Sequence, residues 1–237
     1  MPRNLLLVSS SKCHPHGYLD HCAGQAAELF AGVKEIIFVP YARPGGMTHD
    51  EYTAVARDRF KKMDIDVRGL HEFDNPVLAV QESGGAFIGG GNTFVLLDQL
   101  YSDGVVELMG QRLADGMPYM GTSAGSNVAG LSIGTSNDMP IVEPPSHGAF
   151  AAVPFNINPH YPREAPDPTH MGETRDDRIN EFHFYNQQPV VSIREDSMLR
   201  VQGDKMSLIG QLDGYLFQHG KDRETLTADS DLSYLLK

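Results

Sequence analysis

The chain has 237 residues, of which 41% are hydrophobic and 21% are charged, and its formal net charge is -12 at pH 7. This length and composition are typical of one globular domain, and we expect a single domain over residues 1–237. The acidic balance argues against nucleic acid as a partner, because phosphate binding needs a basic surface. The apolar runs are too short for a membrane-spanning helix or a signal peptide, so we expect a cytoplasmic protein without a membrane partner.

The two cysteines, Cys13 and Cys22, are the only ones in the chain. Nothing else suggests a disulfide framework, so we expect both thiols to be reduced. The histidines and cysteines also lack the spacings that are typical of zinc sites. We therefore expect neither a metal nor a cofactor.

Apolar runs that suit buried strands alternate with segments of helical periodicity along the first half of the chain. The expected strands are 4–10, 35–42, 65–73 and 85–91, and the expected helices are 18–32, 48–63 and 75–83. A late helix over 172–185 and short strands within 190–218 follow an irregular region. Such alternation predicts an α/β fold: a parallel sheet with a mixed edge and helices on both faces. Ligands bind to such sheets in the loops beyond the carboxyl ends of the strands.

The stretch GTSAG places Ser123 in a Gly-x-Ser-x-Gly frame, after the strand-like PYMG and before a segment rich in small residues. This frame is typical of a nucleophile elbow, a tight strand-to-helix turn that exposes the serine hydroxyl. The backbone N–H of Ala124 and the start of the following helix would then stabilise an oxyanion. The frame can also arise by chance in a glycine-rich chain, but the segments on either side favour a true elbow.

A second glycine-rich loop lies in IGGGNTF, residues 88–94. It lacks the Gly-Lys-Ser/Thr ending of a phosphate-binding loop and the last glycine of a dinucleotide fingerprint. It is either a plain strand-to-helix turn or a source of a second oxyanion donor. In the second interpretation, Gly90 and Gly91 bring a backbone N–H beside Ser123.

A serine nucleophile needs a base. Among the ten histidines, we favour His160, which ends a strand-like run and is bracketed by prolines that fix the backbone. His147 and His170 lie in the same irregular region and are alternatives. Asp138 and Glu195 are both candidates for the carboxylate that orients the base, and either could equally be a turn residue.

Six ordered motifs, GGGNTF, GTSAGSN, TSNDMPIVEP, INPHY, GETRDDRI and REDSML, together resemble the peptidase E family, the α-aspartyl dipeptidases. These are serine peptidases on a fold related to class I glutamine amidotransferases, and the resemblance spans nearly the whole chain. It implies a serine dipeptidase that hydrolyses dipeptides with an N-terminal aspartate, Asp-Xaa, through an acyl-enzyme. One departure is Thr122, which precedes the serine where the family carries tryptophan.

The resemblance implies a role for each residue of the catalytic machinery. Ser123 would be the nucleophile, His160 the base and Glu195 the third member of the triad. This chain order differs from the Ser, Asp/Glu, His order of the α/β-hydrolases. The oxyanion donors would be the backbone N–H groups of Gly91 and Ala124.

The resemblance also implies three substrate-binding residues. Arg175 of GETR would bind the aspartate side chain, Asp138 the free α-amino group, and Asn92 would line the pocket. An arginine offers a planar, two-pronged donor that suits a carboxylate. On residues alone, an arginine in TRDDR would equally form ion pairs along a solvent-facing helix.

Two other functions stay open from the sequence. A cyanophycinase-like β-aspartyl peptidase shares the elbow and acts on β-linked aspartyl-arginine, whereas a non-catalytic binding module would keep the elbow for packing. A glutamine amidotransferase would need cysteine at position 123, where this chain has Ser123. The sequence also leaves a homodimer open.

Overall fold

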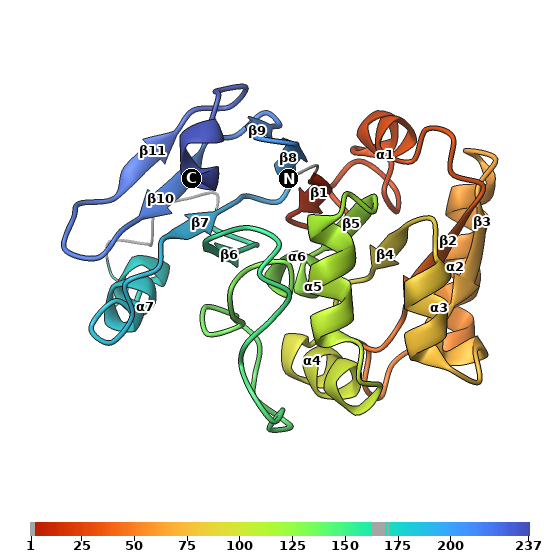
Figure 1. The fold of residues 1–237 in the computed structure, drawn as a ribbon. Helices are drawn as coiled ribbons and strands as arrows, with labels where there is room; N and C mark the ends of the chain where they lie inside the picture. The colour runs from red at the N-terminus through yellow and green to blue at the C-terminus, as the bar shows by residue number, and fades with distance from the viewer. Residues whose placement is uncertain (1–2, 163–168, 170) are drawn as a thin grey trace.

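The computed structural model of the protein describes residues 3–162, 169 and 171–237 (Figure 1). Within these residues, the main sheet has seven strands in the order β3-β2-β4-β5-β1-β8-β9. Its strands are β1 (Asn4–Val8), β2 (Glu35–Val39), β3 (Asp66–Gly69), β4 (Ala86–Ile88), β5 (Tyr119–Thr122), β8 (Met198–Gln202) and β9 (Lys205–Ile209). The pairs from β3 to β1 are parallel, whereas β8 and β9 extend the sheet in antiparallel fashion. The expected parallel sheet with a mixed edge is confirmed.

Alternate side chains of β1 belong to opposite faces of this sheet, as the two-residue period of a strand requires. Leu5 and Leu7 join the larger hydrophobic cluster, whereas Leu6 and Val8 join a second one. All four side chains are completely buried. A continuous apolar run is therefore needed here, because both faces of the strand are covered.

Helices cover both faces of the sheet, as expected. Residues of α1 (Ala23–Leu29) and α2 (His49–Lys61) pack into the second cluster. Residues of α3 (Pro76–Glu82), α4 (Thr93–Ser102) and α5 (Val106–Ala114) pack into the larger cluster on the other face. The Thr-x-x-Glu spacing of Thr48 and Glu51 predicts a capping box at the start of α2, and the structure has it. Thr48 Oγ1 accepts from the N–H of Glu51 (3.2 Å), and the Glu51 carboxylate accepts from the N–H of Thr48 (2.8 Å).

A second sheet, in the order β11-β10-β7-β6, lies beside the first (Figure 1), and α7 packs on one of its faces through Ile179, which contacts Val190 and Phe217. Its elements are β6 (Asn156–Asn158), α7 (Arg175–Phe182), β7 (Val190–Ser192), β10 (Gly214–Phe217) and β11 (Glu224–Leu226), and the chain ends in the 3-10 turn η2 (Ser233–Leu236). Ile157, Val191 and Leu216 belong to the larger cluster of the main sheet. The sequence indicated short strands in this region but not their division between two sheets.

Most expected elements are shorter than predicted, and for two of them the structure shows how the element ends. The helix expected over 18–32 is restricted to α1, because Leu19 has a φ of 57°, which an α-helix does not accommodate. The strand expected over 65–73 ends at Gly69 and continues as the 3-10 turn η1 (Leu70–Glu72).

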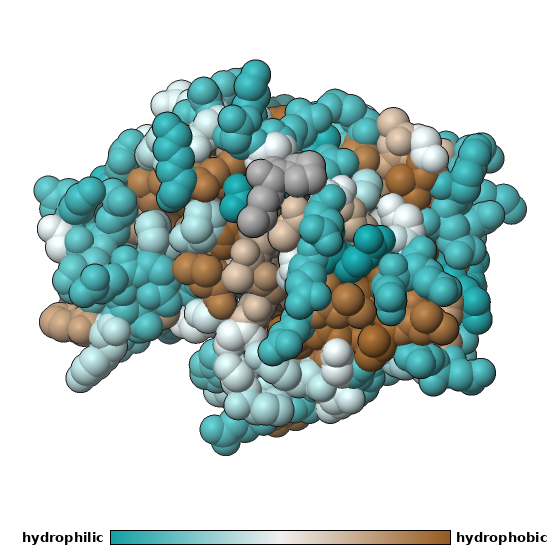
Figure 2. Space-filling view, in the orientation of Figure 1, coloured by the Kyte–Doolittle hydropathy of each residue, from teal (hydrophilic) through white to brown (hydrophobic). Residues whose placement is uncertain are grey.

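The visible surface of the molecule carries mainly polar side chains (Figure 2). Figure 2 shows a mostly polar face, with an apolar area over α3 where Val77 and Leu78 are 39% and 46% exposed. In the described part of the chain, helices that are long and apolar enough to span a membrane do not occur. Cys13 and Cys22 are both buried, and Cys22 is a free thiol, in agreement with the expectation for that residue.

Candidate active site

Ser123 occupies a sharp turn at the carboxyl end of a central strand. It follows β5 directly and precedes α6 (Ala124–Asn127), a single helical turn. Its backbone angles, φ 53° and ψ −110°, lie outside the regions that residues other than glycine prefer. This is the strand–serine–helix context of a nucleophile elbow.

The small residues around Ser123 are required by close backbone contacts. A Cβ atom on Gly121 would lie 2.4 Å from the carbonyl oxygen of Gly125, and one on Gly125 would lie 2.3 Å from that of Ile88. A Cβ atom on Gly90 would lie 3.0 Å from the Cβ of Ser123. The Gly-x-Ser-x-Gly frame is therefore explained by packing of the turn against β4 and its following loop.

The structure brings together the serine, histidine and glutamate that the sequence singled out. His160 Nε2 lies 2.7 Å from Ser123 Oγ, and His160 Nδ1 lies 2.8 Å from Glu195 Oε1. His160 follows β6, and Glu195 lies between β7 and β8, so one residue comes from each of three neighbouring strand ends. A hydroxyl, an imidazole and a carboxylate in this order can activate the hydroxyl as a nucleophile.

Two of the alternatives, His147 for the base and Asp138 for its partner, make other contacts. The ring of His147 packs edge-on against Phe94, with centroids 5.7 Å apart, and His170 is outside the described residues. The carboxylate that contacts His160 is that of Glu195; the described contacts of Asp138 are all with hydroxyl and backbone N–H groups.

The loop after β4 is held in an unusual conformation beside the serine. Gly91 has a φ of 146°, and a Cβ atom there would lie 2.0 Å from the carbonyl oxygen of Ala42, so only glycine fits. The preceding carbonyl, that of Gly90, accepts from Arg43 Nε (3.2 Å) and from the Tyr52 hydroxyl (3.3 Å). Because a peptide bond is planar and trans, these two donors also fix the direction of the Gly91 N–H.

The two expected oxyanion donors thus flank the serine. Ala124 directly follows Ser123, and Gly91 follows the glycine that contacts it. Among the described residues, neither the Gly91 nor the Ala124 N–H donates to a protein oxygen. A pair of uncommitted N–H groups beside a nucleophile can stabilise a negatively charged oxygen.

Arg175, the first residue of α7, lies next to this site. Its Nη1 contacts Asn158 Oδ1 at 3.0 Å and the carbonyl oxygens of Pro159 and His160 at 3.5 Å. Partial burial lowers the pKa of the Arg175 guanidinium, and the nearby positive charge of Arg178 adds to this effect. Within the part of the chain that the structure describes, the hydrogen-bond partners of Arg175 are neutral oxygen atoms.

Asp138 is anchored through one carboxylate oxygen. Its Oδ2 accepts from the N–H of Thr93 (2.8 Å), the hydroxyl of Thr93 (2.5 Å) and the hydroxyl of Ser136 (3.0 Å). The neighbouring Asn127 in turn donates to the Thr93 hydroxyl at 3.1 Å. Asp138 therefore joins the irregular segment to the start of α4, close to the helical turn that follows Ser123.

Asn92 is largely engaged by the backbone. Its Oδ1 caps α4 by accepting from the N–H groups of Phe94 (3.0 Å) and Val95 (3.1 Å), and its Nδ2 donates to Met139 O at 2.8 Å. Asn92 directly follows Gly91 in the loop after β4, and the described contacts give its side chain a structural role.

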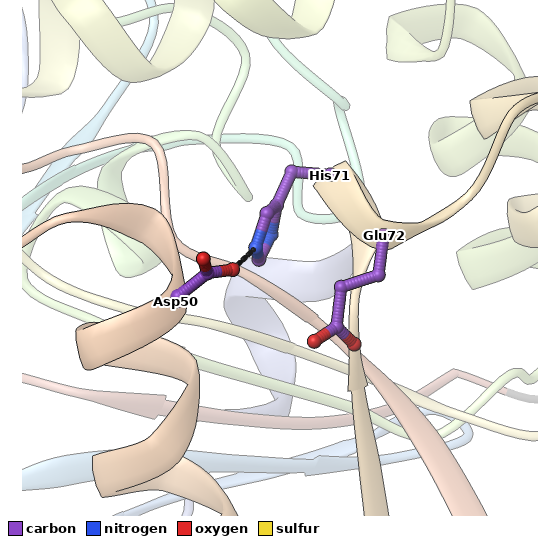
Figure 3. Close-up of side chains that lie close together, drawn as sticks. All are labelled: Asp50, His71 and Glu72. Carbon is purple, nitrogen blue, oxygen red and sulfur yellow. Dashed lines mark hydrogen bonds and ion pairs between the residues drawn. The ribbon is translucent and has the colours of Figure 1, made fainter.

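A separate group of possible metal ligands lies between the N-terminal end of α2 and η1. Asp50, His71 and Glu72 bring their ligand atoms within 4.8 Å of one another (Figure 3). However, His71 Nε2 already contacts Asp50 at 2.8 Å, and both oxygens of Glu72 accept from Arg57 at 3.0 Å. Glu72 also accepts from the N–H of Gly69 at 2.8 Å. These contacts account for the group without a metal.

The chain is similar to known proteins along nearly its whole length. The model of peptidase family S51 matches residues 5–209. A Drosophila melanogaster protein named "Probable alpha-aspartyl dipeptidase" is 48% identical over 99% of this chain and 98% of its own length. "Peptidase E" of Streptomyces coelicolor is 46% identical over 98% of this chain and 95% of its own length.

A likeness in structure accompanies the likeness in sequence. The crystal structure of a peptidase from an acI-B1 Actinobacterium superposes with a TM-score of 0.71 at 18% identity, covering 98% of this chain and 97% of that chain. This likeness shows that the two proteins share a fold. From the family match and the two relatives, the chain belongs to peptidase family S51.

Proposed function

We propose that the protein is a serine-type dipeptidase that hydrolyses dipeptides with an N-terminal aspartate. Membership of family S51 and the names of the two relatives support this activity. The observation that carries the mechanism is the continuous contact from Ser123 Oγ through the His160 ring to Glu195 Oε1, with distances of 2.7 and 2.8 Å.

Acylation follows from this geometry. Ser123 Oγ attacks the scissile carbonyl while His160 Nε2 takes the hydroxyl proton, and the Glu195 carboxylate stabilises the imidazolium that forms. The carbonyl oxygen becomes negatively charged and accepts from the N–H groups of Gly91 and Ala124. The C–N bond then breaks as His160 passes its proton to the leaving amine, which departs as a free amino acid.

Deacylation uses the same groups. His160 takes a proton from a water molecule, whose oxygen attacks the ester carbonyl of the acyl-enzyme. The tetrahedral intermediate again uses the Gly91 and Ala124 N–H groups. When the ester bond breaks, His160 returns the proton to Ser123 Oγ, and free aspartate leaves.

The specificity for aspartate rests on charges around the serine. We propose that Arg175 binds the side-chain carboxylate, since its described partners are neutral oxygens and it lies 3.5 Å from the carbonyl of His160. Asp138 would bind the free α-amino group with Oδ1, the oxygen opposite the anchored Oδ2, and Asn92 would line the wall. The positive charge of Arg175 suits the side-chain carboxylate of the substrate, and the negative charge of Asp138 suits its α-amino group.

Further properties belong to the same proposal. We place the enzyme in the cytoplasm, a compartment in which cysteines stay reduced, because nothing in the sequence suggests a disulfide framework. We also propose one domain over residues 1–237, since strands of both sheets contribute to one hydrophobic cluster. Small peptides, and not nucleic acid, would be its partners, in keeping with a net charge of -12.

A panel of dipeptides tests the proposal. Asp-Leu, β-linked Asp-Leu, β-linked Asp-Arg, Asn-Leu, Glu-Leu and Ala-Leu would be compared by release of free leucine or arginine, and a fluorophosphonate probe would label the serine. We expect rapid cleavage of Asp-Leu alone and labelling of Ser123. Faster cleavage of the β-linked peptides would favour the cyanophycinase-like alternative. A folded protein that neither cleaves nor takes the label would be a binding module.

A further inference from the structure

The last residue of β1 and the one after it contact all three segments that supply the proposed triad. The carbonyl oxygen of Val8 accepts from the N–H of Ser123 at 3.0 Å. Ser9, which is completely buried, contacts the other two segments. The proposed mechanism gives no role to either residue.

The Ser9 hydroxyl lies between the base and the segment of the carboxylate. It accepts from the backbone N–H of His160 at 2.9 Å and donates to the carbonyl of Ile193 at 3.1 Å. The backbone N–H of Ser9 donates to the carbonyl of Ser197 at 3.1 Å. Ile193 and Ser197 precede and follow Glu195 by two residues each, so Ser9 holds both ends of the turn that carries it.

This contact acts on a residue whose backbone needs support. His160 has a φ of 57°, a left-handed conformation that is unfavourable for a side chain other than glycine. Such a conformation persists only where surrounding contacts fix it. The hydrogen bond to Ser9 restrains the His160 amide itself, and the N–H of the next residue, Tyr161, donates to the same Ile193 carbonyl at 3.1 Å.

We propose that Ser9 is a positioning residue of the triad: through its hydroxyl, it holds the His160 backbone and the Glu195 turn so that the imidazole meets both Ser123 and Glu195. The inference rests on the proposed serine mechanism. A displacement of about 1 Å in a reacting group can lower a rate by ~10²-fold. Because the buried Ser9 hydroxyl fixes the position of His160, we expect its loss to lower the rate of turnover. Substrate binding through Arg175 has its own anchor in Asn158 Oδ1, at 3.0 Å.

The variant Ser9→Ala tests this role. Alanine leaves the His160 N–H without its acceptor, and the Ile193 carbonyl keeps only the N–H of Tyr161, so one restraint between the two segments is lost. For Asp-Leu we expect kcat to fall by about 10- to 100-fold, with KM changed by less than about threefold. The folded fraction of each protein would be measured by urea unfolding before kinetics.

Tyr101→Phe is the matched control. It also removes one hydroxyl that joins two distant segments, through a hydrogen bond of 2.8 Å to the carbonyl of Gly148, but its described contacts do not include the triad segments. We expect Tyr101→Phe to lose stability while it keeps kcat. The proposal is overturned if Ser9→Ala keeps kcat within about threefold of the parent, or if Tyr101→Phe at equal stability loses as much.

A measurement on the parent protein covers the case in which Ser9→Ala does not fold. Hydrogen exchange followed by NMR reports the protection of the His160 amide directly. We expect it to exchange as slowly as the buried strand amides of β1, because its acceptor is completely buried. Exchange at the rate of exposed loop amides would overturn the role of Ser9. This readout needs no turnover, so a failure of the serine mechanism itself, seen as an active Ser123→Ala variant, would be recognised separately.

Discussion

His160 and Ser123 are both held in left-handed backbone conformations, with φ values of 57° and 53°, and their side chains meet at 2.7 Å. Each conformation costs about 1–3 kcal/mol for a residue that is not glycine. The two residues are 37 positions apart in the chain, so the fold keeps unfavourable geometry at both ends of one hydrogen bond. Geometry of this kind is typical of residues whose placement matters for chemistry.

Replacing the nucleophile should abolish turnover without unfolding the protein. Ser123→Ala keeps the Cβ atom that the tight turn accommodates and removes only Oγ. We expect kcat for Asp-Leu to fall by at least ~10³-fold. The activity that remains would come from substrate binding and the oxyanion donors. The stability of the variant, from urea unfolding, should stay close to that of the parent. Near-normal turnover by the purified variant would rule out the serine mechanism.

The base can be distinguished from another histidine of the irregular region. His160→Ala should match the loss of Ser123→Ala, because only an imidazole within hydrogen-bond reach of Oγ can take its proton. His147→Ala should keep most activity, since its ring packs against Phe94. Initial rates on Asp-Leu for the two variants, measured at equal folded fraction, check this. Equal losses in both would contradict the assignment.

Amide substitutions of Glu195 and Asp138 should have different effects on catalysis. Glu195→Gln should lower kcat by up to ~10⁴-fold, because an amide cannot stabilise the imidazolium as a carboxylate does. Asp138→Asn should mainly raise KM for substrates with a free α-amino group. The comparison uses Asp-Leu and a small ester without an amino group. If Asp138→Asn prevents acylation by the ester while Glu195→Gln does not, the two roles are reversed.

Much of the fold was predictable from local patterns. The capping box at Thr48 reflects contacts within one helical turn. The apolar run of β1 and the small residues around Ser123 can be recognised as short stretches of sequence, although the contacts that require them are with distant segments. The tail was harder: β6 and β7 have three residues each, too few to show a period, and their pairing is decided by distant segments.

The site was predictable only in part. Residue chemistry left Glu195 and Asp138 as equal candidates, and the family resemblance made the choice that the His160 contact then agreed with. Ser9 gave no signal, because a serine after a strand is common and its partner is 151 residues away in the chain. The same holds for Arg43, whose contact with the Gly90 carbonyl joins two loops.

The protein should lose stability as the pH falls below about 6.5. His183 is buried, and burial lowers the pKa of its imidazole below the ordinary value. The unfolded chain therefore binds this proton more readily than the folded protein does. The contribution is fully present above the unfolded pKa of ~6.5 and is lost as the pH falls through the interval down to the folded pKa.

Urea unfolding of the parent and of His183→Gln at several pH values between 5 and 8 would measure this effect. Glutamine stays neutral over that range and can still donate to the Gln188 carbonyl, which His183 Nε2 contacts at 3.1 Å. We expect a shallower fall in the free energy of unfolding for the variant. His21 and His49 also have pKa values lowered by burial, so part of the dependence should remain. Identical slopes in both proteins would exclude His183 as a contributor.

The last prediction concerns the choice of substrate. Arg175→Met removes the guanidinium but keeps an extended apolar stem, so the half-buried site loses its charge with little loss of packing. A site built around a charged partner rejects analogues that lack it by as much as ~10⁴-fold. We expect kcat/KM for Asp-Leu to fall by about 10²- to 10⁴-fold, whereas Ser123 should react with a small fluorophosphonate at the parent rate.

Arg178→Met, on the same helix, is the matched control. The Arg178 side chain is 60% exposed and lies 3.6 Å from Glu173, a surface ion pair of the kind that contributes little to stability or binding. We expect this variant to cleave Asp-Leu as the parent does, and the parent to cleave Glu-Leu poorly, because one more methylene misplaces the carboxylate. The role of Arg175 is disproved if Arg175→Met cleaves Asp-Leu as fast as Arg178→Met does, or if the parent hydrolyses Ala-Leu at a comparable rate.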